Sequence, residues 1–256
     1  ATSSYDMIKA LVEAGATMFR LNTSHGTEEM HAANIETIRK VSKETGIYIP
    51  ILVDLQGPKI RVGNIPNPIE IKEGQELILE ATDKVNNSDI IPVDYEGIAN
   101  DVKAGDKILL DDGNIGLSVL KVVNNQVYVK VLYGSLIKPR KGINLPGTTA
   151  SLSAVTERDV EYIRFAVQYD ADYIALSFVR EASDIELAKK HIKNFGGYIP
   201  VIAKIEKPQA VENIESILKF ADGIMVARGD LGIEMSPEEV PIVQKYIVDK
   251  TIRERK

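Results

Sequence analysis

The segment V-I-A-K-I-E-K at residues 201–207 joins an apolar run to a lysine and a glutamate. Successive side chains of a strand point to opposite faces, so Lys204 and Glu206 point to the same face. A buried ion without a partner or a ligand costs several kcal/mol. Residues 223–232, G-I-M-V-A-R-G-D-L-G, repeat the layout with Arg228 and Asp230. The two segments therefore bring cations and anions to one level, which is typical of an ion-pair network or of a ligand site.

Other apolar runs also end in polar groups, at Arg20, Asn22 and Ser24, at Asp54 and at Ser177. Runs with a strand pattern alternate with runs of helical period, which predicts parallel strands joined by crossover helices. The expected strands are residues 17–21, 47–55, 173–179, 199–205 and 223–226. The expected helices are residues 2–16, with Ser3 or Ser4 as cap, 27–45, with Thr27 as cap, 156–169, 183–194, 208–220 and 237–253.

The position of the polar residues favours a TIM barrel over an open sheet. Active sites of TIM barrels are assembled from the carboxyl ends of several strands, whereas an open doubly wound sheet usually carries a glycine-rich phosphate loop, and no such loop occurs here. Five strands are visible, and a closed barrel has eight. We therefore expect an incomplete (β/α)8 barrel, and a chain that is a fragment of a longer protein.

Residues 59–146 change the period from 3.6 to 2, with short β-type runs separated by K-E-G-Q, K-A-G-D, D-D-G-N and V-N-N-Q turns. This pattern predicts a small antiparallel β domain, barrel-like and able to act as a lid, inserted into a barrel formed by residues 1–58 and 147–256. Pro58 and residues 145–147 are the expected hinge crossings.

Composition limits the class of protein. The chain has 256 residues, of which 44% are hydrophobic and 27% charged, with a net charge of -6 and no cysteine. A disulfide or a thiolate metal site is therefore excluded. The negative charge argues against a nucleic-acid partner, and the lack of a long apolar run argues against a membrane partner. We expect a cytoplasmic protein.

Six motifs, in order and at matching spacing, resemble the pyruvate kinase family over essentially the whole chain. They are R-L-N-T-S-H-G (20–26), D-L-Q-G-P-K-I-R (54–61), L-D-D-G (110–113), K-G-I-N-L-P-G (141–147), A-K-I-E-K (203–207) and M-V-A-R-G-D-L-G (225–232). The resemblance implies phosphoryl transfer from phosphoenolpyruvate to ADP, giving pyruvate and ATP in the last step of glycolysis. It also implies that the inserted domain is the family's B domain, that a C domain is absent, and that the parent is a homotetramer. The isolated chain is expected to be inactive.

The resemblance also assigns roles to residues. Lys204, Arg20 and Arg61 are implied to be catalytic, and Arg20, Lys204, Gly229 and Asp230 to bind the substrate. Glu206 and Asp230 are implied to hold Mg²⁺ or Mn²⁺, which suits a metal that takes its other oxygens from substrate and water. Simpler alternatives remain: Lys204 could only pair with Glu206, Asp230 could cap a helix, and Arg20 or Arg61 could be salt-bridged rim residues.

His25, Arg61 and Asp112 are implied to bind the nucleotide. His25 could instead be a hydrogen-bonded scaffold group, and D-D-G-N around Asp112 is also a good turn sequence. We expect the other two histidines, His31 and His191, to face solvent.

A monovalent-cation site is implied at Asn22, Ser24, Asp54 and Leu55. Relatives that require K⁺ have glutamate where this chain has Lys59, and a lysine ammonium can supply the charge of the ion. K⁺ is therefore expected to be unnecessary here, unless Lys59 is only a solvated residue at the domain crossing.

Two other functions stay open. A related barrel could bind Mg²⁺ with a 2-oxo acid for aldolase or lyase chemistry, although the lid and the pair Arg20 and Arg61 argue against it. The chain could also be a non-catalytic binding module, because an open partial barrel exposes apolar edges.

Overall fold

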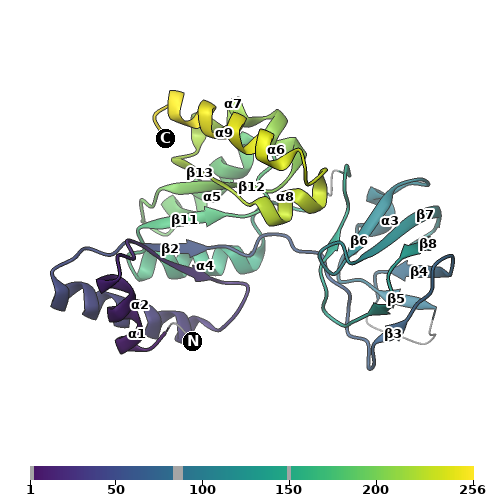
Figure 1. Cartoon of the computed structure of the whole chain (residues 1–256), viewed down its shortest axis with the longest axis horizontal. Helices are drawn as coiled ribbons and strands as arrows, with labels where there is room; N and C mark the ends of the chain where they lie inside the picture. The colour runs from purple at the N-terminus through teal and green to yellow at the C-terminus, as the bar shows by residue number, and fades with distance from the viewer. Residues whose placement is uncertain (1–2, 83–88, 149–150) are drawn as a thin grey trace. The chain divides into compact units, whose positions relative to one another are not determined.

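The computed structural model describes residues 3–82, 89–148 and 151–256. The chain divides into two compact units (Figure 1). The first unit comprises residues 1–58, 153–227 and 245–256, and the second comprises residues 59–152 and 228–244. Across the described ranges, no helix has both the length and the apolar character needed to cross a membrane.

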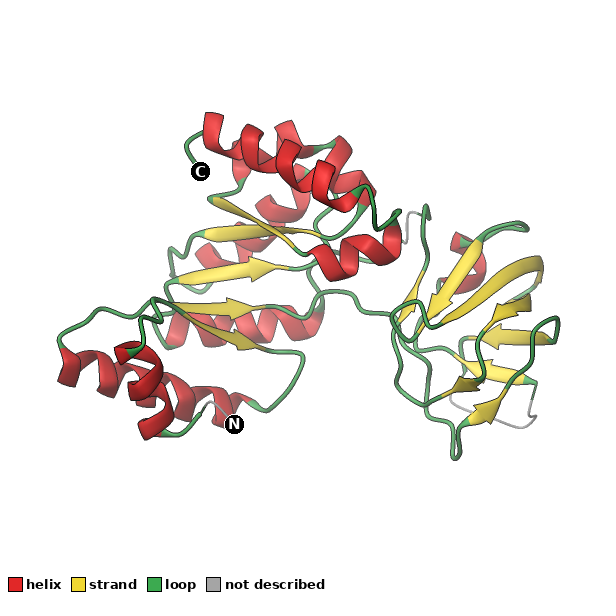
Figure 2. Ribbon diagram, in the orientation of Figure 1, coloured by secondary structure: helices red, strands yellow, loops and turns green. Residues whose placement is uncertain are grey.

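The first unit is built on a parallel sheet of five strands, shown in yellow in Figure 2. The strands run in the order β1 (Phe19–Asn22), β2 (Ile51–Asp54), β11 (Tyr173–Leu176), β12 (Val201–Ile205) and β13 (Gly223–Val226). Every neighbouring pair is parallel. The five predicted strands and the predicted α/β fold are confirmed, and the sheet corresponds to an incomplete barrel.

Helices connect these strands, and several begin at the expected caps. The Ser4 and Thr27 hydroxyls accept hydrogen bonds from Met7 N and Met30 N at the starts of the first two helices. Residue 2 of the first predicted helix lies outside the described residues. The helices of the first unit are α1 (Tyr5–Glu13), α2 (Glu28–Thr45), α4 (Glu157–Gln168), α5 (Ala182–Asn194), α6 (Pro208–Glu212) and α7 (Ile214–Phe220).

Several predicted bounds were wrong. The single helix expected at 208–220 is two helices that meet at Asn213. The strand expected at 47–55 is limited to Ile51–Asp54, directly after Pro50, and proline has no backbone N–H to donate to a sheet. The last helix, α9 (Val240–Arg253), begins three residues later than predicted, and the short helix α8 (Arg228–Glu234) was not predicted.

The second unit contains a six-stranded sheet in the order β10, β6, β7, β8, β4, β5. The segment 60–63 connects the two edge strands: Ile143 N donates to Ile60 O, and Gly63 N donates to Pro92 O. These bonds close the sheet into a barrel, as the sequence indicated, around a core that includes Leu77, Ile108 and Val129. Its strands are β4 (Glu76–Glu80), β5 (Ile90–Pro92), β6 (Lys107–Leu110), β7 (Ile115–Val123), β8 (Gln126–Tyr133) and β10 (Ile143–Asn144).

The second unit is not purely antiparallel, because β4 pairs with β5 in parallel. The second unit also contains a separate pair, β3 (Ile69–Glu70) with β9 (Leu136–Ile137), the one-turn helix α3 (Ile98–Asp101) and the short helix α8. The sequence did not predict β5, β9, β10 or α3, because each has four residues or fewer and is too short to show a period.

Candidate functional site

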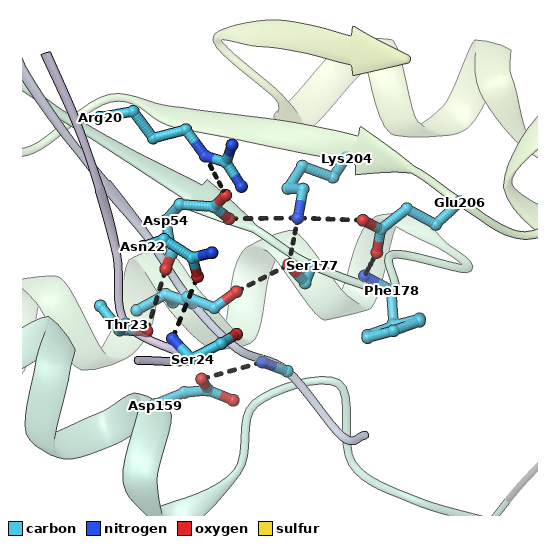
Figure 3. Close-up of polar contacts among 12 residues, drawn as sticks. Arg20, Asn22, Thr23, Ser24, Asp54, Asp159, Ser177, Phe178, Lys204 and Glu206 are labelled. Carbon is cyan, nitrogen blue, oxygen red and sulfur yellow. Dashed lines mark hydrogen bonds and ion pairs between the residues drawn. The ribbon is translucent and has the colours of Figure 1, made fainter. Parts of the chain in front are cut away.

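Strand register brings the polar strand ends of the first unit to one edge of its sheet. Asn22 pairs with Asp54, Asp54 pairs with Ala175, and Ala175 pairs with Ile202. Leu176 pairs with Ala203, so Ser177, directly after β11, lies beside Lys204 in β12. Figure 3 shows their side chains converging with those of Arg20, Asp54 and Glu206.

Lys204 is the centre of this cluster. Its Nζ lies 2.9 Å from Glu206 Oε1, 3.2 Å from Asp54 Oδ1 and 2.7 Å from Ser177 Oγ (Figure 3). Lys204 is 8% exposed, and both carboxylates are 1% exposed. An ammonium has three N–H donors, so each donor has a protein acceptor.

The charge state of Lys204 follows from these neighbours. Burial lowers the pKa of its ammonium, but the negative charges of Glu206 and Asp54 outweigh burial and hold the pKa above its ordinary value of 10.5. Lys204 is therefore a cation at neutral pH. It can stabilise developing negative charge, and it cannot act as a base there.

Arg20 supplies a second cation. Its Nε donates to Asp54 Oδ2 at 2.6 Å, while the side chain remains 52% exposed. Asp54 thus lies between two cations, and its backbone oxygen accepts from both Thr23 N and Thr23 Oγ1.

Glu206 is oriented by the backbone of the loop after β11. Its Oε2 accepts from Phe178 N at 2.7 Å. Phe178 has a φ of 54°. A Cβ added at Gly57 would lie 2.9 Å from the Phe178 ring and 3.0 Å from Ser177 Cβ. Only a residue without a side chain can approach this turn so closely.

The loop after β1 holds three predicted site residues. Asn22 Oδ1 accepts from Ser24 N at 3.1 Å, and His25 is exposed. The prediction that His31 faces solvent was wrong, because it is 7% exposed and its Nε2 lies 2.9 Å from His25 O. His31 shares the buried face of α2 with Ile35, Ile38 and Val41. The spacing of four, three and three residues is present in the sequence, but His31 was expected to face solvent because its ring is polar.

The second unit holds Lys59, Arg61 and Asp112. Arg61 NH1 donates to Arg140 O at 3.2 Å, and Arg61 N donates to Asp94 Oδ1 at 2.6 Å. Burial raises the pKa of Asp94 above its ordinary value, against the opposing effect of that hydrogen bond. Asp112 is exposed in a turn where its φ is 55°, and the Lys59 side chain passes close to the Gly142 backbone.

Gly229 and Asp230 also belong to the second unit. Gly229 is exposed, and a Cβ there would meet nothing within 4 Å. Asp230 lies in the first turn of α8, where the negative charge of a carboxylate stabilises the helix. In the part of the chain that the structure describes, no three His, Cys, Asp or Glu side chains form a cluster that could hold a metal.

This chain is similar to known proteins over nearly all of its length. A family model described as the pyruvate kinase barrel domain matches residues 1–256. The chain belongs to the pyruvate kinase family. The pyruvate kinase of Thermotoga maritima is 43% identical over 248 residues, which are 96% of this chain and 53% of that protein. The pyruvate kinase of Corynebacterium glutamicum is 44% identical over 249 residues, which are 97% of this chain and 52% of that protein.

A third pyruvate kinase, from Geobacillus stearothermophilus, is 43% identical over 257 residues, or 98% of this chain and 43% of that protein. The chain thus spans about half the length of the curated pyruvate kinases that it matches. Of the predicted site residues in this chain, the structure brings together Arg20, Asp54, Lys204 and Glu206.

Two contacts of the site, those of the Ser177 side chain and the Phe178 backbone, were not predicted from the sequence. Ser177 ends an apolar run, as the predicted residues do, and the register of a parallel sheet could have placed it beside Lys204. The Phe178 contact had no sequence signal, because it depends on a left-handed backbone at a residue other than glycine.

Proposed function

We propose that this chain carries a central part of the catalytic machinery for phosphoryl transfer from phosphoenolpyruvate to ADP, the reaction of pyruvate kinases. In this reaction the bond from phosphorus to the enolate oxygen breaks, a bond to the terminal ADP oxygen forms, and a proton adds to the enolate carbon. The observation that best supports the proposal is the buried Lys204 ammonium, held among Asp54, Glu206 and Ser177.

Lys204 and Arg20 are proposed to bind the transferred phosphoryl group. Catalysis of this transfer depends mainly on positioning and on neutralising negative charge. Lys204 remains a cation, since its pKa is raised, and a fixed ammonium stabilises both the phosphoryl oxygens and the enolate oxygen. Arg20 is anchored through Nε, so its planar fork can meet two phosphoryl oxygens.

Glu206 and Asp230 are proposed to hold Mg²⁺ or Mn²⁺. The donor set fits, because both side chains offer hard carboxylate oxygens and Glu206 is fixed by the Phe178 N–H. Mg²⁺ commonly takes one or two protein carboxylates and completes its shell with substrate and water, so a larger acidic cluster is not required. When bound, the metal neutralises the phosphoryl and enolate oxygens. Gly229, next to Asp230, leaves room for a substrate carboxylate.

The nucleotide is proposed to contact His25, Arg61 and Asp112. His25 and Asp112 are exposed, and the Arg61 backbone is fixed by Asp94. We also propose that residues 59–146 form the lid domain, and that residues 1–58 and 147–256 form the barrel domain. The complete enzyme is proposed to be a cytoplasmic homotetramer of glycolysis.

The monovalent-cation site is proposed at Asn22, Ser24, Asp54 and the Leu55 backbone, with Lys59 in place of the ion. The Asn22 side-chain amide oxygen already accepts from Ser24 N, and the Asp54 carboxylate oxygen Oδ2 already accepts from Arg20 Nε. An added K⁺ would therefore compete with existing donors, which supports the proposal that this enzyme works without K⁺.

The test is pyruvate formation by the full product of the gene. Pyruvate is measured with phosphoenolpyruvate, ADP and Mg²⁺, and again with each of the three omitted in turn. We expect a rate that requires all three. Release of pyruvate that does not depend on ADP would point to lyase chemistry and overturn the proposal, as would the absence of pyruvate.

A further inference from the structure

Ser177 makes two hydrogen bonds that fix the direction of its hydroxyl. The hydroxyl donates to Leu55 O at 2.7 Å and accepts from Lys204 Nζ at 2.7 Å, and the residue is 2% exposed. A hydroxyl has one hydrogen, so the bond to Leu55 O leaves its lone pairs for the ammonium. Ser177 therefore has a defined role as the acceptor of a Lys204 hydrogen.

Ser177 differs from the other two acceptors of Lys204 because it carries no charge. Asp54 and Glu206 hold the ammonium in place, but they also neutralise its charge. A neutral hydroxyl can fix the position of the ammonium without reducing its field toward an incoming anion. Asp54 forms the longest of the three contacts and is also bound by Arg20, so it is the acceptor most easily exchanged for a phosphoryl oxygen.

The turn that carries Ser177 orients two site residues at once. The Ser177 side chain contacts Lys204, and the N–H of the next residue, Phe178, contacts Glu206. The close approach of Gly57 holds this turn against the end of β2. Removal of the hydroxyl therefore leaves the turn in place and affects only the Lys204 contact and the Leu55 contact.

We propose that Ser177 is a positioning residue for Lys204 in phosphoryl transfer. The proposal rests on the proposed function, since it requires that Lys204 acts on the transferred group. Positioning errors of about 1 Å can lower a rate about 100-fold. Because the ammonium is held from three sides, we expect Ser177→Ala to lower kcat about 10-fold to 100-fold and to change the KM for phosphoenolpyruvate much less.

The experiment compares three variants of the full gene product. Ser177→Ala removes the hydroxyl, and Ser177→Thr retains it and should keep most of the activity. Ser42→Ala is the matched control, because Ser42 Oγ also donates to a backbone carbonyl, that of Ile47, outside the site. Thermal unfolding of each variant shows whether a lost rate reflects lost fold. A Ser177→Ala enzyme with unchanged kcat would overturn the proposal, and so would equal rate losses in Ser177→Ala and Ser42→Ala.

A second measurement separates this proposal from the proposed function. Crystal structures of the protein and of Ser177→Ala show whether Lys204 Nζ moves when the hydroxyl is removed. If the unmodified protein forms no pyruvate from phosphoenolpyruvate and ADP, the proposed function fails, and the role of Ser177 in catalysis fails with it. If it forms pyruvate but Nζ keeps its place in the variant, only the positioning role is overturned. If Ser177→Ala does not fold, the rate and the Nζ position in Ser177→Thr decide: retained hydroxyl contacts with a kcat reduced 100-fold would contradict the proposal.

Discussion

The Lys204 cluster illustrates how one buried cation depends on two buried anions. Removing one partner of a buried ion pair destabilises a protein by more than the intact pair stabilises it, because the remaining charge has neither water nor a partner. Here two carboxylates, each 1% exposed, face one ammonium. The stability of the first unit is therefore expected to respond sharply to the loss of this single charge.

We predict that Lys204→Met destabilises the protein by about 3–5 kcal/mol at pH 8. Part of this loss should be recovered at pH 5, because protonation of an unpaired buried carboxylate removes the uncompensated charge. In the unmodified protein the folded pKa of Lys204 is raised above 10.5, so the contribution of Lys204 is complete below that pH and is lost only as the pH rises through the folded value.

Urea denaturation at pH 5 and pH 8 measures both effects. Lys250→Met is the control, since Lys250 pairs with Glu215 on the surface, and it should change stability little at either pH. Equal losses for the two variants would contradict the prediction.

A second prediction concerns Lys59. We expect the full gene product to work without added K⁺, and Lys59→Glu to make it dependent on K⁺, because the substitution removes the ammonium that we propose takes the place of the ion. Rates are compared in KCl and in the chloride of a large, non-binding cation at equal ionic strength. Lys103→Glu provides the same charge change at an exposed lysine of the second unit. Strong K⁺ activation of the unmodified enzyme would contradict this prediction.

At the scale of elements, Asp159 joins the two chain segments that lead into and out of residues 59–152. Its Oδ1 accepts from Gly57 N at 3.1 Å, and its Oδ2 accepts from Thr156 N at 2.9 Å. Asp159 is 0% exposed. One carboxylate in the first turn of α4 therefore fixes the end of the segment after β2 and the start of its own helix, and both lie within the first unit.

We predict that Asp159→Ala lowers the free energy of unfolding by about 2–4 kcal/mol, because it removes a helix cap and leaves a buried N–H without an acceptor. Asp184→Ala is the matched control: Asp184 has the same place in the capping box of α5 and accepts from Glu181 N and Arg180 N. The control should cost about 1 kcal/mol. Denaturation measures stability, and hydrogen exchange at Gly57 N should accelerate only in Asp159→Ala. A larger loss in the control would show that Gly57 is held by other contacts.

The elements of this fold differ in how well the sequence predicts them. Long helices with side-chain caps, such as α2 after Thr27, and β13 were predicted within a few residues, because their period and end signals are local. Other features depend on contacts between residues that are distant in sequence. These are the division of the predicted helix 208–220 into two helices at Asn213 and the short strands β5 and β10. In the site, the charged side chains of Lys204 and Glu206 could be recognised from the sequence as candidate functional groups. The contacts of Ser177 and Phe178 could not, because they depend on the register of the sheet and on a turn with positive φ.

At the scale of the whole molecule, the sheet of the first unit ends at β1 and β13. A closed barrel of this type has eight strands, and the catalytic groups of such barrels come from several of them. The chain matches 53% of the length of the Thermotoga maritima relative. Lys204, Arg20 and Glu206 are nevertheless already in contact with their partners in this chain.

We therefore predict that the purified 256-residue chain is folded but turns over phosphoenolpyruvate and ADP at least about 100-fold more slowly than a complete pyruvate kinase, since the loss of even one stabilising donor costs that much. Far-ultraviolet circular dichroism checks the fold, and pyruvate release checks turnover. The two measurements must be made on the same sample, because a misfolded chain would also be inactive. If any residual rate is uncatalysed background, the Lys204→Met variant of the chain should show the same rate. Steady pyruvate release that disappears in Lys204→Met would show that the five-strand sheet is sufficient for catalysis, against this prediction.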